Sequence, residues 1–232
     1  MCGRFTLRTP QQVLVSQFAV ETQTTLFPRF NIAPSQPVAV VRAVADSVGA
    51  KRELVKLRWG LVPSWAQDPA VGNQMINARV ETAATKPAFR SAMRNRRCLI
   101  PVDGFYEWKK VGKQKQPYFI HLADDKPFAF AGLWEQWSDP EGRPLETCTI
   151  LTTDANPLLR PLHDRMPVIV EPGDYATWLD PAQTDPSQLR PMFASLTANQ
   201  LVMSPVSTLV NSPANDDPRC VEPSEGEKLL FD

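Results

Sequence analysis

The sequence is poor in the residues that build metal centres and disulfide frameworks. Its four cysteines are widely scattered without a Cys-x-x-Cys pair, and it contains only two histidines. We therefore expect neither a zinc site nor disulfides, and no metal or other cofactor. No apolar run is long enough to cross a bilayer, and no signal or transit peptide is evident. A cytoplasmic protein without a membrane partner is expected, associated with the nucleoid in a bacterium and nuclear in a eukaryote.

An excess of charge of either sign is also missing, because 25 lysine and arginine residues balance 25 aspartate and glutamate residues. This balance argues against a protein that coats duplex DNA by charge alone, but it leaves room for a local basic groove. Positive charge concentrates at 90–97 and at 109–115. Taken singly, each cluster is explained by the solvated face of a helix or a hairpin.

Glycine is scarce, at ten residues, whereas proline is frequent, at 23, which indicates short, stiff connections between many short elements. Strands are predicted at 38–44 and 54–59 around a polar loop (45–53), then at 98–102, 128–133 and 147–152, with a hairpin at 104–110 and 118–122. Helices are predicted from Thr9-Pro10 through Phe18, at 81–96 and at 173–179. Without a regular βαβ rhythm, this pattern predicts one α+β domain (1–217), mainly antiparallel or mixed β-sheet with flanking helices, and a flexible tail at 218–232.

The first five residues, Met-Cys-Gly-Arg-Phe, place a cysteine where loss of one methionine would free its α-amine. Such a residue has two nucleophiles: its amine condenses with an aldehyde and its thiolate closes a thiazolidine ring, or its thiol attacks a carbonyl with the amine as base. The reference pKa is about 7.7–8.0 for the α-amine and about 8.5 for the thiol, so both the neutral amine and the thiolate are present in useful amounts near neutral pH. On this pentapeptide alone, a cysteine with no chemical role is an open alternative.

Residues 75–82, Met-Ile-Asn-Ala-Arg-Val-Glu-Thr, alternate between polar and apolar side chains. In an extended chain, Asn77, Arg79 and Glu81 would share one face. An amide beside a guanidinium suits an anionic or carbonyl-bearing ligand. A half-exposed strand with a salt bridge is the alternative.

Glu107 and His163 are candidates for proton transfer. Glu107 lies among aromatic residues, which can raise the pKa of a carboxyl group. In a strand, Tyr106 and Trp108 would point away from Glu107, so Trp108 either packs in the core or stacks on a ligand. His163 lies in a proline-bounded loop, a typical place for function, whereas His121 falls in an apolar strand pattern and is expected to be structural.

Two further segments could line a groove for DNA bases. Trp65 lies in a Pro/Ser loop, where an exposed indole is costly without a partner such as a stacked base. Residues 31–34, Asn-Ile-Ala-Pro, are typical of a rigid turn. A role in covering the core is the alternative for both.

Six segments occur in a fixed order: Met-Cys-Gly-Arg-Phe, Asn-Ile-Ala-Pro, Trp-Gly-Leu-Val-Pro, Asn-Ala-Arg-Val-Glu-Thr, Gly-Phe-Tyr-Glu-Trp-Lys and His-Asp-Arg-Met-Pro. Together, from Cys2 to about Asn211, they resemble the signature blocks of the SOS-response-associated peptidase (SRAP) family, the abasic-site processing proteins. The resemblance implies a protein that binds single-stranded DNA carrying an abasic site and traps the ring-opened sugar as a thiazolidine. It also implies replication-fork junctions as a further partner, and we expect a monomer.

The resemblance also implies roles for individual residues. Cys2 would be the nucleophile once Met1 is removed, by autolysis or by an aminopeptidase. Asn77 would hold the sugar, Glu107 would act as general acid and base, and His163 would transfer the proton that permits reversal. The expected DNA contacts are Arg4, Arg79 and Arg165 at phosphates, and Pro34, Trp65 and Trp108 near bases. The sequence departs from the family pattern at Ala66 and at Lys86-Pro87, where an aromatic residue and an arginine would be expected.

Three alternatives use the same residues differently. N-terminal-nucleophile amidohydrolases also begin Met-Cys-Gly, although Arg4-Phe5 departs from their usual continuation. A thiol peptidase would use Cys2 with His163 and Glu107 on protein substrates. A single-strand binding protein would use none of this chemistry, and its Cys2 would be incidental.

Overall fold

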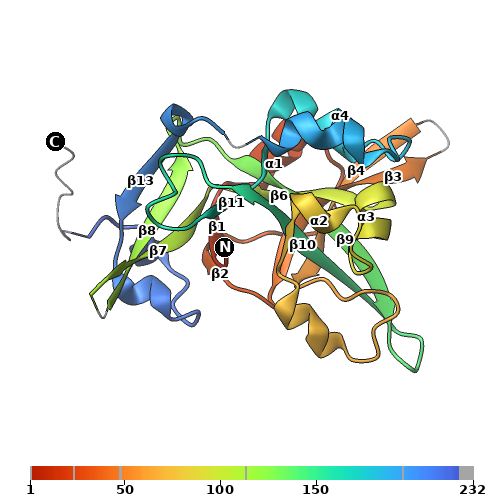
Figure 1. The fold of residues 1–232 in the computed structure, drawn as a ribbon, viewed down its shortest axis with the longest axis horizontal. Coiled ribbons are helices and arrows are strands. Elements are labelled where there is room, and N and C mark those ends of the chain that lie inside the picture. Colours follow the sequence, from red (N-terminus) through yellow and green to blue (C-terminus); the bar gives the residue numbers. More distant parts are fainter. Residues whose placement is uncertain (1, 23, 47–48, 113, 195, 225–232) are drawn as a thin grey trace.

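The computed structural model describes residues 2–22, 24–46, 49–112, 114–194 and 196–224 (Figure 1). Its strands are β1 Phe5–Leu7, β2 Arg29–Ile32, β3 Pro37–Asp46, β4 Gly49–Trp59, β5 Asn77–Arg79, β6 Arg97–Val102, β7 Gly104–Val111, β8 Gln114–Leu122, β9 Phe128–Ser138, β10 Pro144–Asp154, β11 Arg165–Pro167, β12 Ile169–Val170 and β13 Leu201–Pro205. Its α-helices are α1 Gln11–Phe18, α2 Val80–Ala83, α3 Arg90–Asn95 and α4 Tyr175–Leu179. Short 3₁₀ helices are η1 Pro69–Gln74, η2 Pro172–Asp174, η3 Pro186–Phe193, η4 Ala198–Gln200, η5 Thr208–Asn211 and η6 Pro218–Cys220.

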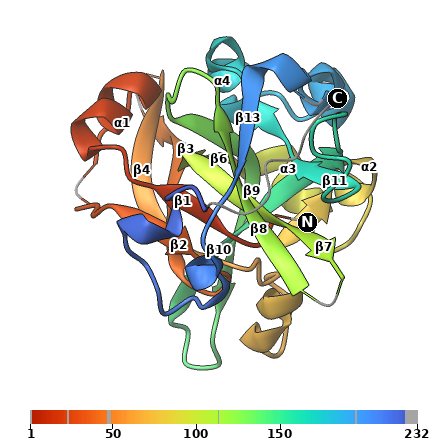
Figure 2. The ribbon, with the colours of Figure 1, turned by 90° about the vertical axis from the view of Figure 1, so that its left-hand side faces the viewer.

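The strands form two sheets, which confirms the predicted α+β class. The smaller sheet has the order β13-β8-β7-β1-β2, and the larger one runs β11-β10-β4-β3-β6-β9-β12. An additional pairing of β9 with β10 closes the middle of the larger sheet into a ring, and β5 adds to β10. Most pairs are antiparallel, but β4 and β5 run parallel to β10. Figure 2 shows the hairpin β7–β8 crossing in front of the larger sheet.

The strand β1 ties the start of the chain into the core between the sheets. Phe5 is buried, its ring centroid lies 5.1 Å from that of Trp59, and its backbone pairs with Phe105 of β7. Cys2 is therefore three residues from a fixed core position. In Figure 1, strand β1 lies in the middle of the molecule rather than at its edge.

Alternation along β7 divides two hydrophobic clusters, as the sequence predicts. Phe105 packs in the main core, whereas Tyr106 and Trp108 contact a smaller cluster that includes Phe119 and Cys220. Glu107 therefore points to the opposite face from Tyr106 and Trp108. The predicted hairpin is confirmed, and β8 begins four residues earlier than expected, at Gln114.

Three of the predicted elements need correction. The helix expected at 81–96 is two short helices, α2 and α3, because Pro87 has no N–H to donate and disfavours a helical residue before it. The polar loop expected at 45–53 is mostly strand, since β3 runs to Asp46 and β4 starts at Gly49. Asn31 and Ile32 end strand β2, and the turn begins only after them.

The segment expected to be a flexible tail starts as part of the domain. Cys220 is fully buried, and Val206 forms a bridge with Pro223. The hydroxyl group of Tyr106 donates to the carbonyl group of Cys220. Residues 218–224 are therefore packed on the smaller sheet, and residues 225–232 lie outside the described residues.

Candidate active site and DNA interface

Asn77 fixes the main chain of Cys2. The strand β5 pairs with β10, with Asn77 opposite Ile150, and the Asn77 Nδ2 group donates to the Cys2 carbonyl oxygen at 2.8 Å. The predicted alternation is confirmed for this strand, because Ala78 is buried and Arg79 is exposed. Asn77 Oδ1 is also buried, and within the described residues no donor bonds to it. It is an acceptor available for a hydroxyl or amine group beside Cys2.

Cys2 and Glu107 are both buried, with 0% and 5% of their surfaces exposed. Burial raises the pKa of the Cys2 thiol well above its usual range, and the carboxylate of Glu107 raises it further. Burial likewise raises the pKa of the Glu107 carboxyl group, an effect that His163 partly offsets. The thiol is therefore protonated at neutral pH, and the nearby carboxyl group is tuned toward the range of a general acid and base.

His163 reaches this site from the loop before β11. Its Nδ1 atom lies 2.9 Å from the backbone nitrogen of Arg165 and 2.8 Å from Asp164 Oδ1. When Nδ1 accepts the Arg165 N–H, the neutral imidazole carries its proton on Nε2. His163 is also one of the groups that lower the pKa of the Glu107 carboxyl group against the effect of burial. Four residues from distant parts of the chain thus gather at one place: Cys2, Asn77, Glu107 and His163.

Trp65, Arg79 and Pro34 have surface available for a ligand. Trp65 is 62% exposed, so its indole does not cover the core. The exposed Arg79 side chain makes no ion pair or hydrogen bond within the described residues. Pro34 is half-buried in the turn after β2, where Ser35 adopts a positive φ of 68°.

Arg4 and Trp108 are instead bonded to the segment that contains η5. Arg4 Nη1 donates to Asn31 Oδ1 at 2.6 Å and to the Val210 carbonyl oxygen at 2.7 Å. The indole nitrogen of Trp108 donates to Asn211 Oδ1 at 2.7 Å. The Arg4 guanidinium also lies 5.9 Å from the Trp108 ring centroid. Trp108 is half-buried: part of its ring packs against the smaller hydrophobic cluster, and part remains exposed for a ligand.

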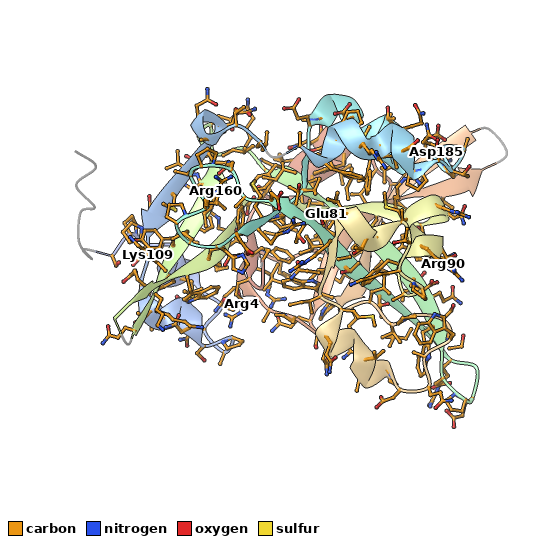
Figure 3. All side chains as sticks on the ribbon, viewed as in Figure 1. Arg4, Glu81, Arg90, Lys109, Arg160 and Asp185 are labelled. Atoms are coloured by element: carbon orange, nitrogen blue, oxygen red, sulfur yellow. The ribbon has the colours of Figure 1, made fainter. Side chains whose placement is uncertain are left out.

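Arg165 is buried, with 6% of its surface exposed, and both terminal nitrogens of its guanidinium donate to protein acceptors. It forms a two-pronged ion pair with Glu81 at 2.7 and 2.9 Å, and it also donates to Asp154 Oδ1 and to the Thr152 carbonyl oxygen, both at 2.6 Å. The expectation that Glu81 continues the extended chain of Asn77 is wrong, because the strand ends at Arg79 and Glu81 lies in α2. Figure 3 places Glu81 centrally, over the larger sheet.

The chain matches the family model described as SOS response associated peptidase (SRAP) over residues 1–213. It belongs to this family. Among its relatives, "Abasic site processing protein YoqW" of Bacillus subtilis is 45% identical, over 96% of this chain and 99% of the relative. "Abasic site processing protein HMCES" of Gallus gallus is 34% identical, over 85% of this chain and 67% of the relative. A crystal structure of a Bacteroides thetaiotaomicron protein shares the fold, with a TM-score of 0.84 at 23% identity, covering 96% of this chain and all of the other.

In this SRAP chain, three further residues support the site, and of these only Asn31 lies in a segment that the sequence pattern singles out. Asn31 is fully buried, and its Nδ2 group donates to the carbonyl oxygens of Val210, Ser212 and Asn215. The carboxylate of Asp216 accepts the backbone N–H groups of residues 30 and 31. Asn211 holds Trp108, so these contacts connect the C-terminal segment with the neighbours of Cys2 and Glu107. Their sequence separations, from 103 to 186 residues, conceal them.

The part of the chain that the structure describes contains neither a metal-binding cluster nor a membrane-spanning helix. No group of three or more His, Cys, Asp and Glu side chains there is arranged to hold a metal ion. Nor is any described helix long and apolar enough to cross a membrane.

Proposed function

We propose that this chain traps abasic sites in single-stranded DNA as a covalent adduct on Cys2. The observation that carries the proposal is the gathering of Cys2, Glu107 and His163 around a main chain that Asn77 anchors. Membership of the SRAP family, with relatives named abasic site processing proteins, supports the DNA lesion as the substrate. Replication-fork junctions are a further proposed substrate, and a monomer is the proposed state.

The chemistry follows from the protonation states at the site. The abasic sugar opens to its aldehyde when its ring oxygen gains a proton and its hydroxyl group loses one, two transfers that Glu107 and His163 would perform. The α-amine of Cys2 then adds to the aldehyde and expels one water to give an imine. The thiol adds across this C=N bond: sulfur bonds to carbon, and the thiol proton passes to nitrogen. Burial favours the protonated thiol, so we propose that the amine makes the first bond and that Glu107 accepts the thiol proton in the second step.

This reaction requires that Cys2 has a free amine. We propose that the Met1–Cys2 peptide bond is hydrolysed first, by the chain itself or by a methionine aminopeptidase. Peptidase activity would be confined to this one bond. A thiazolidine outlasts a simple imine, so the adduct would shield the lesion until repair.

The test is intact mass after the purified chain is mixed with a single-stranded oligonucleotide that carries an abasic site. We expect a species equal to the protein without Met1 plus the DNA, minus one water, and no such species with Cys2→Ala. Retention of Met1, or no adduct on an oligonucleotide whose aldehyde has been verified, contradicts the proposal.

The same preparation separates the alternatives. Release of ammonia from glutamine indicates an amidohydrolase. Cleavage of an unrelated peptide that Cys2→Ala abolishes indicates a general thiol peptidase. Normal DNA protection by Cys2→Ala, without a covalent product, indicates a binding protein in which the cysteine is incidental.

Replacing Arg79 tests the proposed phosphate contact. Arg79 is exposed and carries no ion pair within the described residues, so Arg79→Ala should fold normally. We expect weaker binding to intact and abasic single strands alike, and a plot of log K against log salt that is flatter by about 0.7. Fluorescence anisotropy across a potassium chloride series measures both, and an unaltered slope excludes the contact.

Replacing Asn77 tests the anchoring of Cys2. Asn77→Ala removes the hydrogen bond to the Cys2 carbonyl group, so the amine and thiol lose their fixed position. We expect trapping to slow by about 10- to 100-fold, while intact DNA binds as before. Single-turnover gel assays measure the rate, with Asn95→Ala, at an exposed asparagine of α3, as control. A normal rate would remove Asn77 from the site.

A further inference from the structure

The hairpin β7–β8 extends beyond Glu107 as a basic ribbon. Its exposed or half-exposed cations are Lys109, Lys110 and Lys115, which we call the basic arm. The segment 108–117, Trp-Lys-Lys-Val-Gly-Lys-Gln-Lys-Gln-Pro, contains no acidic residue. No ion pair is formed by the three basic-arm lysines within the described residues. The arm thus keeps its full positive charge in a chain whose net charge is zero.

The strand register places like charges opposite each other. Lys110 pairs directly with Lys115 across the hairpin, and Lys109 pairs with Gln116. Like charges directly opposite on a sheet destabilise the pairing. Near the turn Gly112 has a φ of 60°. An anion bound at this end of the hairpin would offset the repulsion between Lys110 and Lys115.

The basic arm continues the strand of the candidate site, and Lys109 also continues its face. Lys109 is two residues beyond Glu107 on the same strand, so it points to the same face about 6.6 Å further on. Lys110 lies about 10 Å beyond Glu107 along the strand and, like its partner Lys115, points to the opposite face of the hairpin. Figures 1 and 3 show the hairpin leading away from the centre of the molecule, with Lys109 at one end of the long axis.

Two arginines that the family resemblance places at phosphates are already bonded to the protein. Arg165 is buried against Glu81 and Asp154, and Arg4 donates to Asn31 and to the Val210 carbonyl oxygen. A strand threaded past Cys2 therefore needs cations from other residues. The lysines of the basic arm are exposed or half-exposed and form no ion pair within the described residues, so they can supply these cations near Glu107.

We propose that the basic arm binds the phosphates of the DNA strand on one side of the trapped sugar. This rests on the proposed function, since it takes single-stranded DNA as the ligand. The arm carries no base-reading pattern, so its contribution is equal for all sequences and falls with salt.

The first experiment measures equilibrium binding without the covalent step. In a Cys2→Ala background, we compare Lys110→Gln/Lys115→Gln with Arg90→Gln/Arg94→Gln, which removes the same charge from exposed positions of α3. Arg90 lies towards the other end of the molecule from Lys109 (Figure 3). The probe is an intact single-stranded oligonucleotide in a potassium chloride series. We expect the arm variant to flatten the salt slope by about 1.4 and to weaken binding about 20-fold at low salt, and the control to do neither.

The outcomes distinguish this inference from the proposed function. If the Cys2→Ala parent does not bind DNA, the proposed function fails and the inference fails with it. If the parent binds and the arm variant has the same slope, or the α3 control loses as much, the basic arm is not the binding surface while the function stands. Circular dichroism confirms that each variant is folded, which is expected because all four positions are exposed.

A second experiment tests the direction of the strand. Two oligonucleotides carry the abasic site near the 5′ end or near the 3′ end, and the initial rate of adduct formation is measured at low DNA concentration with Cys2 intact. Because the hairpin projects to one side, Lys110→Gln/Lys115→Gln should slow trapping on one of the two substrates only. Equal loss on both, or none on either, contradicts a one-sided contact.

Discussion

Glu107→Gln should slow adduct formation by about 10²- to 10⁴-fold, the usual contribution of a general acid or base. The thiol of Cys2 is protonated at neutral pH, so a base must accept its proton as sulfur bonds to carbon. Burial raises the pKa of that thiol, and the negative charge of Glu107 raises it further. Glutamine has the same size but accepts no proton in this range. Single-turnover trapping of an abasic oligonucleotide measures the rate, with Glu171→Gln, at an exposed position, as control.

The pH dependence should identify Glu107 as the group responsible. Burial raises the pKa of its carboxyl group above the usual 4.5. As the pH falls, this carboxylate is therefore protonated earlier than an ordinary glutamate, and the trapping rate should decline at a higher pH than 4.5. In Glu107→Gln, this decline should be absent. An unchanged rate and profile would exclude Glu107 from catalysis.

The same substitution should have the opposite effect on stability. A carboxyl group whose pKa is higher in the folded than in the unfolded chain stabilises the fold most below its unfolded pKa, and this contribution is lost as the pH rises through the folded pKa. At neutral pH the buried Glu107 carboxylate thus destabilises the fold. We expect Glu107→Gln to have a higher midpoint of urea unfolding at pH 7, with the difference shrinking towards pH 4. Lower stability at pH 7 would show that Glu107 is structural.

Local patterns in the sequence predict the strands well and the helices less well. The alternation in β7 correctly separates Glu107 from Tyr106 and Trp108, because a strand has a fixed period of two. The helix predicted at 81–96 fails at Pro87, which ends helical hydrogen bonding although the surrounding residues are good helix formers. The strand ends within 45–53 are also misjudged, because polar residues are tolerated on the exposed face of a paired strand, as at Lys51.

The sequence predicts which segments contribute to the candidate site, but not how those segments contact one another in space. Each of Cys2, Asn77, Glu107 and His163 lies in a segment whose composition points to chemistry. The partners of those segments depend on tertiary contacts, which no local pattern encodes. Arg4 is bonded to Val210 and Arg165 to Glu81, at sequence separations of 206 and 84 residues. These contacts separate an arginine free to bind phosphate, such as Arg79, from one committed to the fold.

Arg165→Met should lower the free energy of unfolding by about 3 kcal/mol, since hydrogen bonds to charged groups contribute about 1.5–3 kcal/mol each and an unsatisfied buried carbonyl costs about 1–3 kcal/mol. Arg165 connects three elements: Glu81 of α2, Thr152 in β10 and, through its backbone, the His163 loop. Thr152 is fully buried, so its carbonyl group would lose a donor that water does not replace. Urea denaturation at pH 7 measures the change.

The comparison with Arg79→Ala decides what Arg165 does. If Arg165 holds the fold, Arg165→Met lowers stability and slows trapping through His163, while intact DNA binds with an unchanged salt slope; Arg79→Ala shows the reverse. If Arg165 contacts phosphate, its loss flattens the slope by about 0.7.

Glu81→Gln provides an independent check. Burial alone would raise the pKa of Glu81, but hydrogen bonds from Arg165 outweigh burial and lower it. The stability contributed by this pair is therefore present above the usual pKa of 4.5 and lost as the pH falls through the folded value, a loss that Glu81→Gln should abolish.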